Sequence, residues 1–195
     1  MTGPRPSVVV LAGPNGAGKS TVAPALLHDA FGIGEFVNAD VIARGLSAFD
    51  PDRAAITAGR VMLTRLRELA GQRADFAFET TLASRSFAPW LRDLRVSGYD
   101  LHLFFLWLSS ADLAIARVAD RVRMGGHFVP DDVVRRRYSA GIRNFFSLYR
   151  PLATTWALYN TSGLESVRVA EGLSSETIGV YDKDIWDTIR KQGKA

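Results

Sequence analysis

A glycine-containing run near the N-terminus constrains the fold of this chain more than any other feature. Residues 13–20 (GPNGAGKS) follow an apolar, β-branched stretch at 7–12 and precede a segment with helical composition. The run matches the pattern G-x-x-x-x-G-K-[ST], whose glycines let the backbone turn its N–H groups around phosphate oxygens. The next helix adds the positive end of its dipole. We therefore expect a strand, a phosphate-binding loop and a helix in direct succession.

Residue types within this loop predict a nucleotide and a magnesium ion. Lys19 is expected to reach the β- and γ-phosphates, Ser20 to place its hydroxyl on Mg²⁺, and Thr21 to lie near the α-phosphate. The alternative is a chance glycine turn, but the four constrained positions recur in only about one chain of this length in a hundred. The expected cofactors are ATP and Mg²⁺, with Ser20 as metal ligand. The predicted nucleotide-binding residues are Gly13, Pro14, Asn15, Gly16, Ala17, Gly18, Lys19, Ser20 and Thr21.

Hydrophobic patterning predicts alternating strands and helices. That alternation predicts an α/β domain with a mainly parallel five-stranded sheet. Helices are expected to flank the sheet, as in P-loop NTPases and kinases. We expect one domain over 1–195, and Pro24 should distort the first helix because it lacks an N–H. The predicted strands are 7–12, 35–39, 75–78, 100–108 and 156–160, with a small edge strand at 166–170. The predicted helices are 19–30, 53–71, 87–96, 111–123, 131–149 and 184–191.

Composition excludes several classes of protein. The chain has no cysteine, which removes disulfide scaffolds, thiolate zinc sites and cysteine nucleophiles. Its net charge is only +4, and it lacks the dense basic stripe of a dedicated nucleic-acid binder. The first residues lack the apolar core of a signal peptide, and the longest apolar run, 103–108, is too short for a membrane span. We expect a cytoplasmic protein without a membrane or nucleic acid as main partner.

Two acidic residues fall at predicted strand ends. Ligands of parallel sheets bind at the carboxyl ends of strands, and the phosphate loop, Asp40, Glu79 and Ser109 all follow predicted strands. Asp40 is the candidate general base, and a helix cap or turn residue is the alternative. Glu79 could bind substrate hydroxyls or hold a Mg²⁺-bound water. The alternative is a polar residue at a strand exit without a functional role. The central strand, 100–108, ends in two serines instead of the acid of an NTPase.

A basic segment over 117–143 has the composition of a lid. Arg117 and Arg121 lie one helical turn apart, and Arg123 is followed by a glycine-containing loop at 125–130 (GGHFVP) and three arginines at 135–137. Arginine forks suit the charge spread over a transferring phosphoryl group. A solvated charged face is the alternative. His127 fits a hinge position better than a catalytic one.

The combined motifs resemble the zeta-toxin-like P-loop kinases. The resemblance spans roughly 8–160 and rests on GPNGAGKST at 13–21, NAD at 38–40, FETTL at 78–82, RVRMGGHFVP at 121–130 and Arg136. Zeta toxins phosphorylate UDP-N-acetylglucosamine on a sugar hydroxyl with ATP. The resemblance implies Lys19 and Asp40 as catalytic, together with lid residues Arg121 and Arg136 on ATP. It also implies a substrate site near the sugar formed by Asn38, Glu79 and Thr80.

The resemblance leaves the acceptor and the partner open. The Gly-Gly-His loop differs from that of the founding toxins, so sugar specificity is not carried over. Zeta toxins pair with a small helical antitoxin that obstructs the ATP site, which makes a separate antitoxin protein a candidate partner. A small-molecule kinase, with a UDP-sugar as one substrate, is the leading hypothesis. A nucleic-acid end kinase and a nucleotide-dependent switch remain the alternatives.

Overall fold

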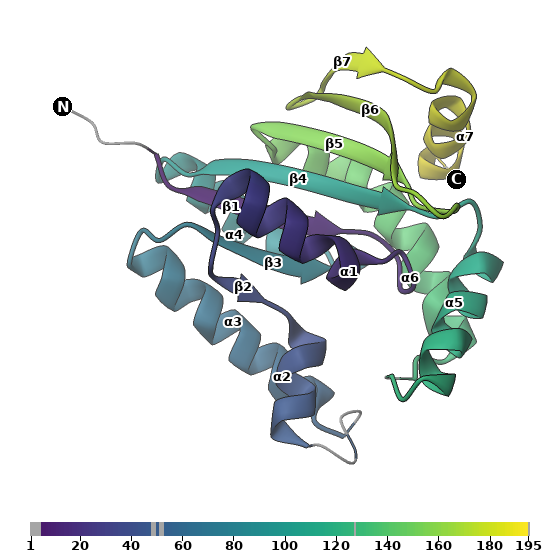
Figure 1. Cartoon of the computed structure of the whole chain (residues 1–195). Coiled ribbons are helices and arrows are strands. Elements are labelled where there is room, and N and C mark those ends of the chain that lie inside the picture. Colours follow the sequence, from purple (N-terminus) through teal and green to yellow (C-terminus); the bar gives the residue numbers. More distant parts are fainter. Residues whose placement is uncertain (1–4, 48–49, 51–52, 127, 195) are drawn as a thin grey trace.

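The fold is built on a seven-stranded sheet. The computed structural model of the chain describes residues 5–47, 50, 53–126 and 128–194. Within them the strands follow the order β2-β3-β1-β4-β5-β6-β7 (Figure 1). The first five strands in this order are parallel to one another. Strand β6 pairs antiparallel with β5, and β7 pairs antiparallel with β6. The strands are β1 Ser7–Ala12, β2 Phe36–Val37, β3 Phe76–Thr80, β4 Asp100–Trp107, β5 Thr155–Asn160, β6 Val167–Leu173 and β7 Glu176–Val180.

Helices cover both faces of this sheet (Figure 1). Phe31, just after η1, packs its ring against His102 and Phe104 of β4 on one face. Phe145 of η2 packs against Phe105 on the opposite face, with 4.8 Å between ring centroids. The helices are α1 Lys19–Ala23, η1 Pro24–Ala30, α2 Ala39–Leu46, α3 Ala55–Gly71, α4 Phe87–Val96, α5 Ala111–Arg123, α6 Asp131–Asn144, η2 Phe145–Tyr149, η3 Arg150–Leu152 and α7 Lys183–Lys194.

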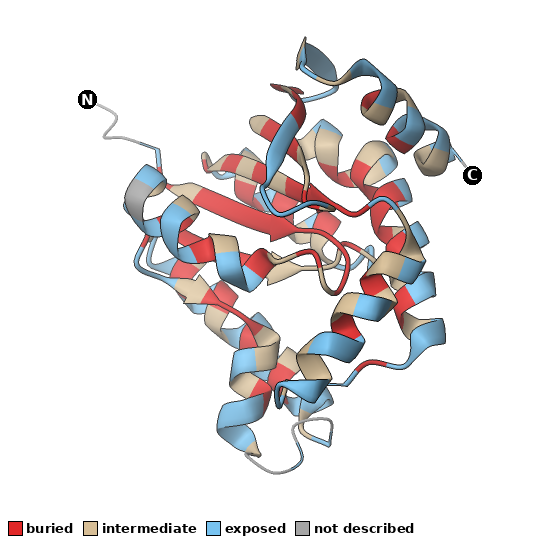
Figure 2. Cartoon of the chain, turned by 45° about the vertical axis from the view of Figure 1, so that its right-hand side comes forward, coloured by how far each residue is buried: buried red, intermediate tan, exposed pale blue. Residues whose placement is uncertain are grey.

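The predicted parallel α/β architecture is confirmed, and the sheet is larger than expected. The central strand β1 is buried along Val8–Ala12 because helices cover both of its faces, as Figure 2 shows. The segment predicted as an edge strand is β6, which lies inside the sheet because β7 pairs with its other side. Four of the five residues of β7 are exposed, so its sequence carries no buried pattern.

Pro24 changes the helix type as predicted from its chemistry. The segment after the phosphate loop is α-helical only to Ala23 and becomes a π-helix, η1, from Pro24 to Ala30. Proline has no N–H to donate to the carbonyl of Ser20, so the α-helical ladder is interrupted at that residue.

The second predicted strand was largely wrong. Only Phe36 and Val37 pair with β3, and Ala39 begins helix α2. Asn38 caps this helix, because its side-chain oxygen accepts hydrogen bonds from the amides of Asp40 (2.8 Å) and Val41 (3.3 Å). Asp40 therefore lies in the first turn of a helix and not at the end of a strand.

A substitution at Gly13, the first glycine of the phosphate loop, tests how closely the end of β1 packs on β4. Its φ is +141°, and a Cβ there would lie 2.3 Å from the carbonyl oxygen of Leu106. Gly13→Ala should lower the free energy of unfolding by about 2 kcal/mol or more. Gly45→Ala in α2 meets no atom within 4 Å and should be nearly neutral. Urea unfolding measures both, and equal midpoints for the two variants would contradict this packing.

Candidate functional site

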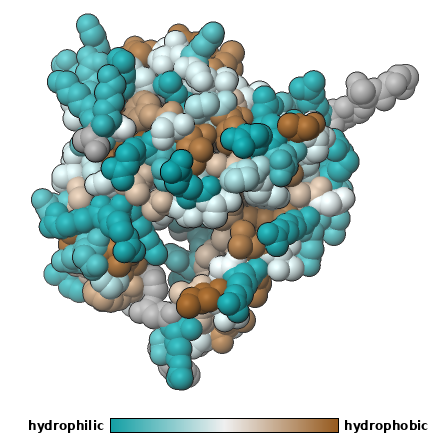
Figure 3. All heavy atoms as spheres, turned by 180° about the vertical axis from the view of Figure 1, so that it is seen from behind, coloured by the Kyte–Doolittle hydropathy of each residue, from teal (hydrophilic) through white to brown (hydrophobic). Residues whose placement is uncertain are grey.

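The candidate site is a cleft of about 970 Å³ beyond the carboxyl ends of β1 and β3. Seen from behind, the space-filling view has a hollow in the lower half of the molecule (Figure 3). Its lining comes from the phosphate loop, α2, α3, the loop after β3, α5 and α6. Chain segments far apart in sequence thus meet at one edge of the sheet, where ligands of such sheets bind.

Lys19 lies inside the phosphate loop and is held by main-chain oxygens. Its Nζ donates to the carbonyls of Gly13 (2.8 Å) and Pro14 (2.9 Å), and the residue is 5% exposed. Burial lowers the pKa of Lys19, whereas the carboxylates of Glu79 and Asp40 raise it and Arg121 lowers it. The ammonium is therefore costly to keep charged, and an anion beside it would relieve that cost.

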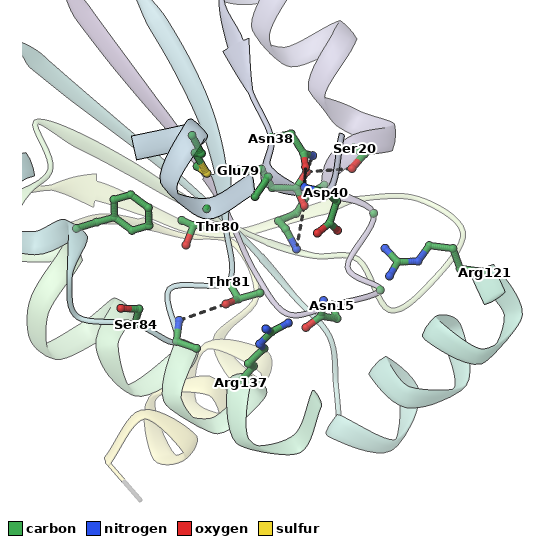
Figure 4. A pocket seen from close by; sticks show the side chains of 18 of the residues that line it. Asn15, Ser20, Asn38, Asp40, Glu79, Thr80, Thr81, Ser84, Arg121 and Arg137 are labelled. Carbon is green, nitrogen blue, oxygen red and sulfur yellow. Dashed lines mark hydrogen bonds and ion pairs between the residues drawn. The ribbon is translucent and has the colours of Figure 1, made fainter. Parts of the chain in front are cut away.

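Glu79 joins three of the predicted site residues. Its Oε2 accepts hydrogen bonds from Ser20 Oγ (2.9 Å) and from Asn38 Nδ2 (2.8 Å). Its Oε1 lies 3.5 Å from Lys19 Nζ. Figure 4 shows Glu79, Asn38 and Ser20 of this cluster close to one another. Glu79 therefore lies on the side of the phosphate loop, next to the predicted metal ligand Ser20.

Asn38 connects Glu79 to Asp40. One end of its amide donates to Glu79, and the other caps the helix that carries Asp40. Asp40 is half-buried and lines the cleft. Its position in the first turn of α2 places the carboxylate near the positive end of the helix dipole. Asn38 thus orients both acidic residues.

Lid arginines approach the cleft from α5 and α6. Arg121 of α5 points toward the phosphate loop in Figure 4, and Arg136 is exposed at the cleft wall. Arg137 is half-buried and lines the cleft together with Thr81 and Asn15. Burial lowers the pKa of Arg137, while Asp40 raises it and Arg136 lowers it.

The sequence pattern favours Arg136 as a lid arginine and does not single out Arg137. A usable signal was present, because Val134, Arg137 and Gly141 are spaced for one helical face. Val134 and Gly141 are both buried, which places Arg137 on the inner side of α6. His127, also assigned to the lid hinge, lies outside the described residues.

Arg117 supports the phosphate loop from behind. Its guanidinium donates to the carbonyls of Thr161 (2.7 Å), Ser162 (2.9 Å) and Gly16 (3.5 Å). Gly16 is needed there, because a Cβ would lie 3.0 Å from Arg117 Cβ. These bonds occupy Arg117 with main-chain oxygens, so it braces the loop.

Thr80 shapes the chain where it leaves β3. Its hydroxyl accepts a hydrogen bond from the amide of Leu82 at 3.1 Å, and Thr81 accepts one from the amide of Ala83 at 3.4 Å. Both threonines line the cleft. The loop after β3 therefore forms the wall of the cleft that faces α3.

The residues present fit a magnesium nucleotide. Gly18, the N-cap of α1, has a φ of +81° and no side-chain cap, so the first amides of that helix are available to an anion. The buried Asn15 Oδ1 has no hydrogen-bond partner among the described residues. Ser20 and Glu79 supply oxygen atoms, which Mg²⁺ prefers. Within the described part of the chain, no group of three or more histidine or acidic residues could hold a metal on its own.

A family comparison agrees with this geometry. The model described as an AAA domain (AAA_33) matches residues 8–146, which include the phosphate loop, α2, the loop after β3 and both lid helices. The chain belongs to this AAA domain family. A protein of Haemophilus influenzae that carries no functional name is 32% identical to it over 126 residues, covering 65% of this chain and 88% of the relative.

Solved structures share the fold of this AAA domain at low sequence identity. A chain of the AvrRxo1-ORF1:AvrRxo1-ORF2 complex with ATP superposes with a TM-score of 0.75 at 20% identity. It covers 96% of this chain, which spans only 64% of that one. A chain of the PezAT toxin–antitoxin system of Streptococcus pneumoniae has a TM-score of 0.63 at 13% identity, covering 100% and 87%.

These matches confirm the predicted resemblance at the level of family and fold. The chain is a P-loop domain of this AAA family and shares its fold with these structures. Within the described residues, no helix combines the length and apolar character needed to cross a membrane.

Lys19→Met tests the phosphate cradle. Because the ammonium makes charge-assisted bonds to phosphate oxygens, its loss should weaken Mg²⁺·ATP binding at least about a hundredfold in titration calorimetry. Lys183→Met, at an exposed position at the start of α7, should bind as the parent does. An unfolding curve establishes that the variant is folded. Equal ATP affinity in the two variants would rule out this role for Lys19.

Proposed function

We propose that this AAA domain is an ATP-dependent phosphotransferase that acts on a hydroxyl of a small molecule in the cytoplasm. The observation that carries the proposal is that Lys19, Glu79 and Asp40 line the same cleft, which continues past the phosphate loop to α3. A nucleotide on the phosphate loop leaves the region around Asp40 and α3 for a second molecule. A domain that only binds or hydrolyses ATP needs no such space.

The nucleotide side of the cleft is assigned to the phosphate loop and its neighbours. Backbone amides at the start of α1 bind the phosphates, and Lys19 moves from the Gly13 and Pro14 carbonyls to the phosphate oxygens. Ser20 would hold Mg²⁺ through its hydroxyl, and Glu79 would hold a water bound to that ion. When bound, Mg²⁺ neutralises charge on the phosphates.

Asp40 is assigned as the base that starts the transfer. Its carboxylate accepts the proton of the acceptor hydroxyl as that oxygen forms a bond to the γ-phosphorus. The bond between the γ-phosphorus and the bridging oxygen breaks, and ADP leaves with that electron pair. Arg121, Arg136 and Arg137 balance the charge on the transferring group. This adds Arg137 to the two arginines chosen from the sequence.

The segment between α5 and α6 is assigned to the exclusion of water. Gly125 has a φ of +83°, and Gly126 packs against Arg121 so closely that a Cβ would lie 2.5 Å from its Cγ. Such glycines allow the chain to reverse between two helices that both carry lid arginines. Closure over ATP prevents water from accepting the phosphoryl group.

A UDP-N-acetyl sugar is our first candidate for the acceptor. The wall that faces α3 is rich in hydroxyls, supplied by Thr80, Thr81, Ser84 and Ser86. Hydroxyls of this kind exchange hydrogen bonds with the hydroxyls and amide of a sugar. Asn38 and Thr80 are assigned to substrate, whereas the bonds of Glu79 favour the magnesium side.

A separate antitoxin protein is the proposed partner. The chains with similar folds include one from a toxin–antitoxin system and one from an ORF1:ORF2 complex. A protein that covers the cleft would block ATP and acceptor together.

Transfer from γ-labelled ATP tests the proposal. The acceptors offered in parallel are UDP-N-acetylglucosamine, other UDP-sugars, nucleosides and an oligonucleotide, with Lys19→Ala as the blank. We expect a labelled UDP-sugar that disappears in the blank. Phosphate release without any labelled acceptor would instead indicate a nucleotide-dependent switch, and a labelled oligonucleotide would indicate a nucleic-acid end kinase.

Asp40→Asn tests the assignment of the base. Turnover should fall by about 10²- to 10⁴-fold because the amide cannot accept the proton, while the affinity for ATP stays within about threefold. Asp93→Asn, on the exposed face of α4, should change neither quantity. If Asp40→Asn abolishes ATP binding, the carboxylate belongs to the metal site and the assignment is wrong.

A further inference from the structure

Side chains of α6 and η2 form hydrogen bonds with the main chain of the cleft wall that faces α3. We call residues 81–86, between β3 and α4, the acceptor loop. Asn144, the last residue of α6, donates from Nδ2 to the carbonyls of Leu82 (2.8 Å) and Ala83 (3.2 Å). The hydroxyl of Tyr149, at the end of η2, donates to the carbonyl of Ser84 at 2.5 Å. Three successive carbonyls of the loop are thus bound by two side chains.

Both side chains are removed from water. Asn144 is 8% exposed and Tyr149 is 1% exposed, so each bond is made in a region where a lost partner is costly. Burial raises the pKa of Tyr149 to about 12, which keeps its hydroxyl protonated and able to donate near neutral pH.

The acceptor loop needs such support because one of its residues has an unfavourable backbone conformation. Leu82 is fully buried with a φ of +55°, a conformation that residues with a side chain rarely adopt. The loop also touches the α6 backbone, since a Cβ on Gly141 would lie 2.5 Å from the carbonyl oxygen of Thr81. Nearby structure must hold this shape, and α6 with η2 provides the contacts.

The main-chain carbonyls and the serine side chains of the loop therefore face different parts of the molecule. Its carbonyls turn toward α6 and η2, while Ser84 and Ser86 line the cleft and share a hydrogen bond of 2.8 Å. Helix α6 also carries Arg137, which lines the cleft together with Thr81. Helix α6 and its continuation η2 therefore connect Arg136 and Arg137 with the wall assigned to the acceptor.

We propose that Asn144 and Tyr149 are positioning residues for the acceptor. By holding three carbonyls of the acceptor loop, they keep its hydroxyls turned into the cleft and in register with the phosphoryl group that α6 also contacts. The proposal rests on the phosphotransferase function above. It assigns these two residues to acceptor binding and not to ATP binding.

Tyr149→Phe and Asn144→Ala test the proposal in the full chain. Tyr99→Phe is the matched control, because the Tyr99 hydroxyl is equally buried and donates to the carbonyl of Ala74 at 3.0 Å, away from the cleft. Hydrogen exchange reports on the amides of Leu82 and Ala83, and steady-state kinetics gives KM for ATP and for UDP-N-acetylglucosamine. Unfolding curves show which variants fold.

We expect both site variants to speed exchange in the acceptor loop and to raise the acceptor KM roughly three- to tenfold. KM for ATP should stay within about twofold, and Tyr99→Phe should lose stability without either effect. Tyr149→Phe, which removes one oxygen atom, decides the matter if Asn144→Ala does not fold.

Two results would overturn the proposal. Exchange in the loop could match the wild type, or the loop could loosen while both KM values stay fixed or rise together. If the wild type labels no acceptor at all, the phosphotransferase function fails separately, and the exchange measurement still decides whether these residues hold the loop.

Discussion

The ion pair between the buried Lys19 and the partly buried Glu79 is the interaction on which the candidate site depends. Removing an ammonium and a carboxylate from water is costly, and their mutual attraction compensates only when further hydrogen bonds are made. Here Lys19 donates to two carbonyls, and Glu79 accepts from Ser20 and Asn38. The pair therefore exists only where the phosphate loop, β3 and α2 meet.

The parallel register of the sheet brings these parts together. Leu11 of β1 lies opposite Glu79 of β3, and Ala12 lies opposite Thr80. The phosphate loop leaves β1 at the level where β3 presents its acid, so the distance between Lys19 and Glu79 follows from strand pairing. On the far side of β3, the β2 strand delivers Asn38 to the same carboxylate. The cleft is in this sense a product of the sheet order.

Local patterns predicted the phosphate loop, most strands and the distortion at Pro24, because their causes lie within a few residues. Features that depend on distant contacts escaped prediction. Helix α2 was not predicted, although Asn38 is a strong N-cap residue: its first residue, Ala39, was assigned to the end of a strand, and the rest of this short helix of eight residues was left unassigned. Strand β7 has no buried face and gains its place only by pairing with β6. Asn144 and Tyr149 reach the acceptor loop across 61 to 65 positions, a separation that no short pattern encodes.

The cleft thus has a nucleotide side built around Lys19 and Glu79 and an acceptor side built around Asp40 and the acceptor loop. This division predicts that Glu79 serves the metal and not the acceptor. The most direct test is the affinity for ATP with Mg²⁺ and with EDTA, in the wild type and in Glu79→Gln. The gain in affinity from Mg²⁺ should fall by about tenfold or more in the variant, because the metal-bound water loses its carboxylate, while binding in EDTA is not weakened. A Glu79→Gln variant that keeps the full gain in ATP affinity from Mg²⁺ would contradict the assignment of Glu79 to the metal. Glu79 would then be assigned to the acceptor side of the cleft.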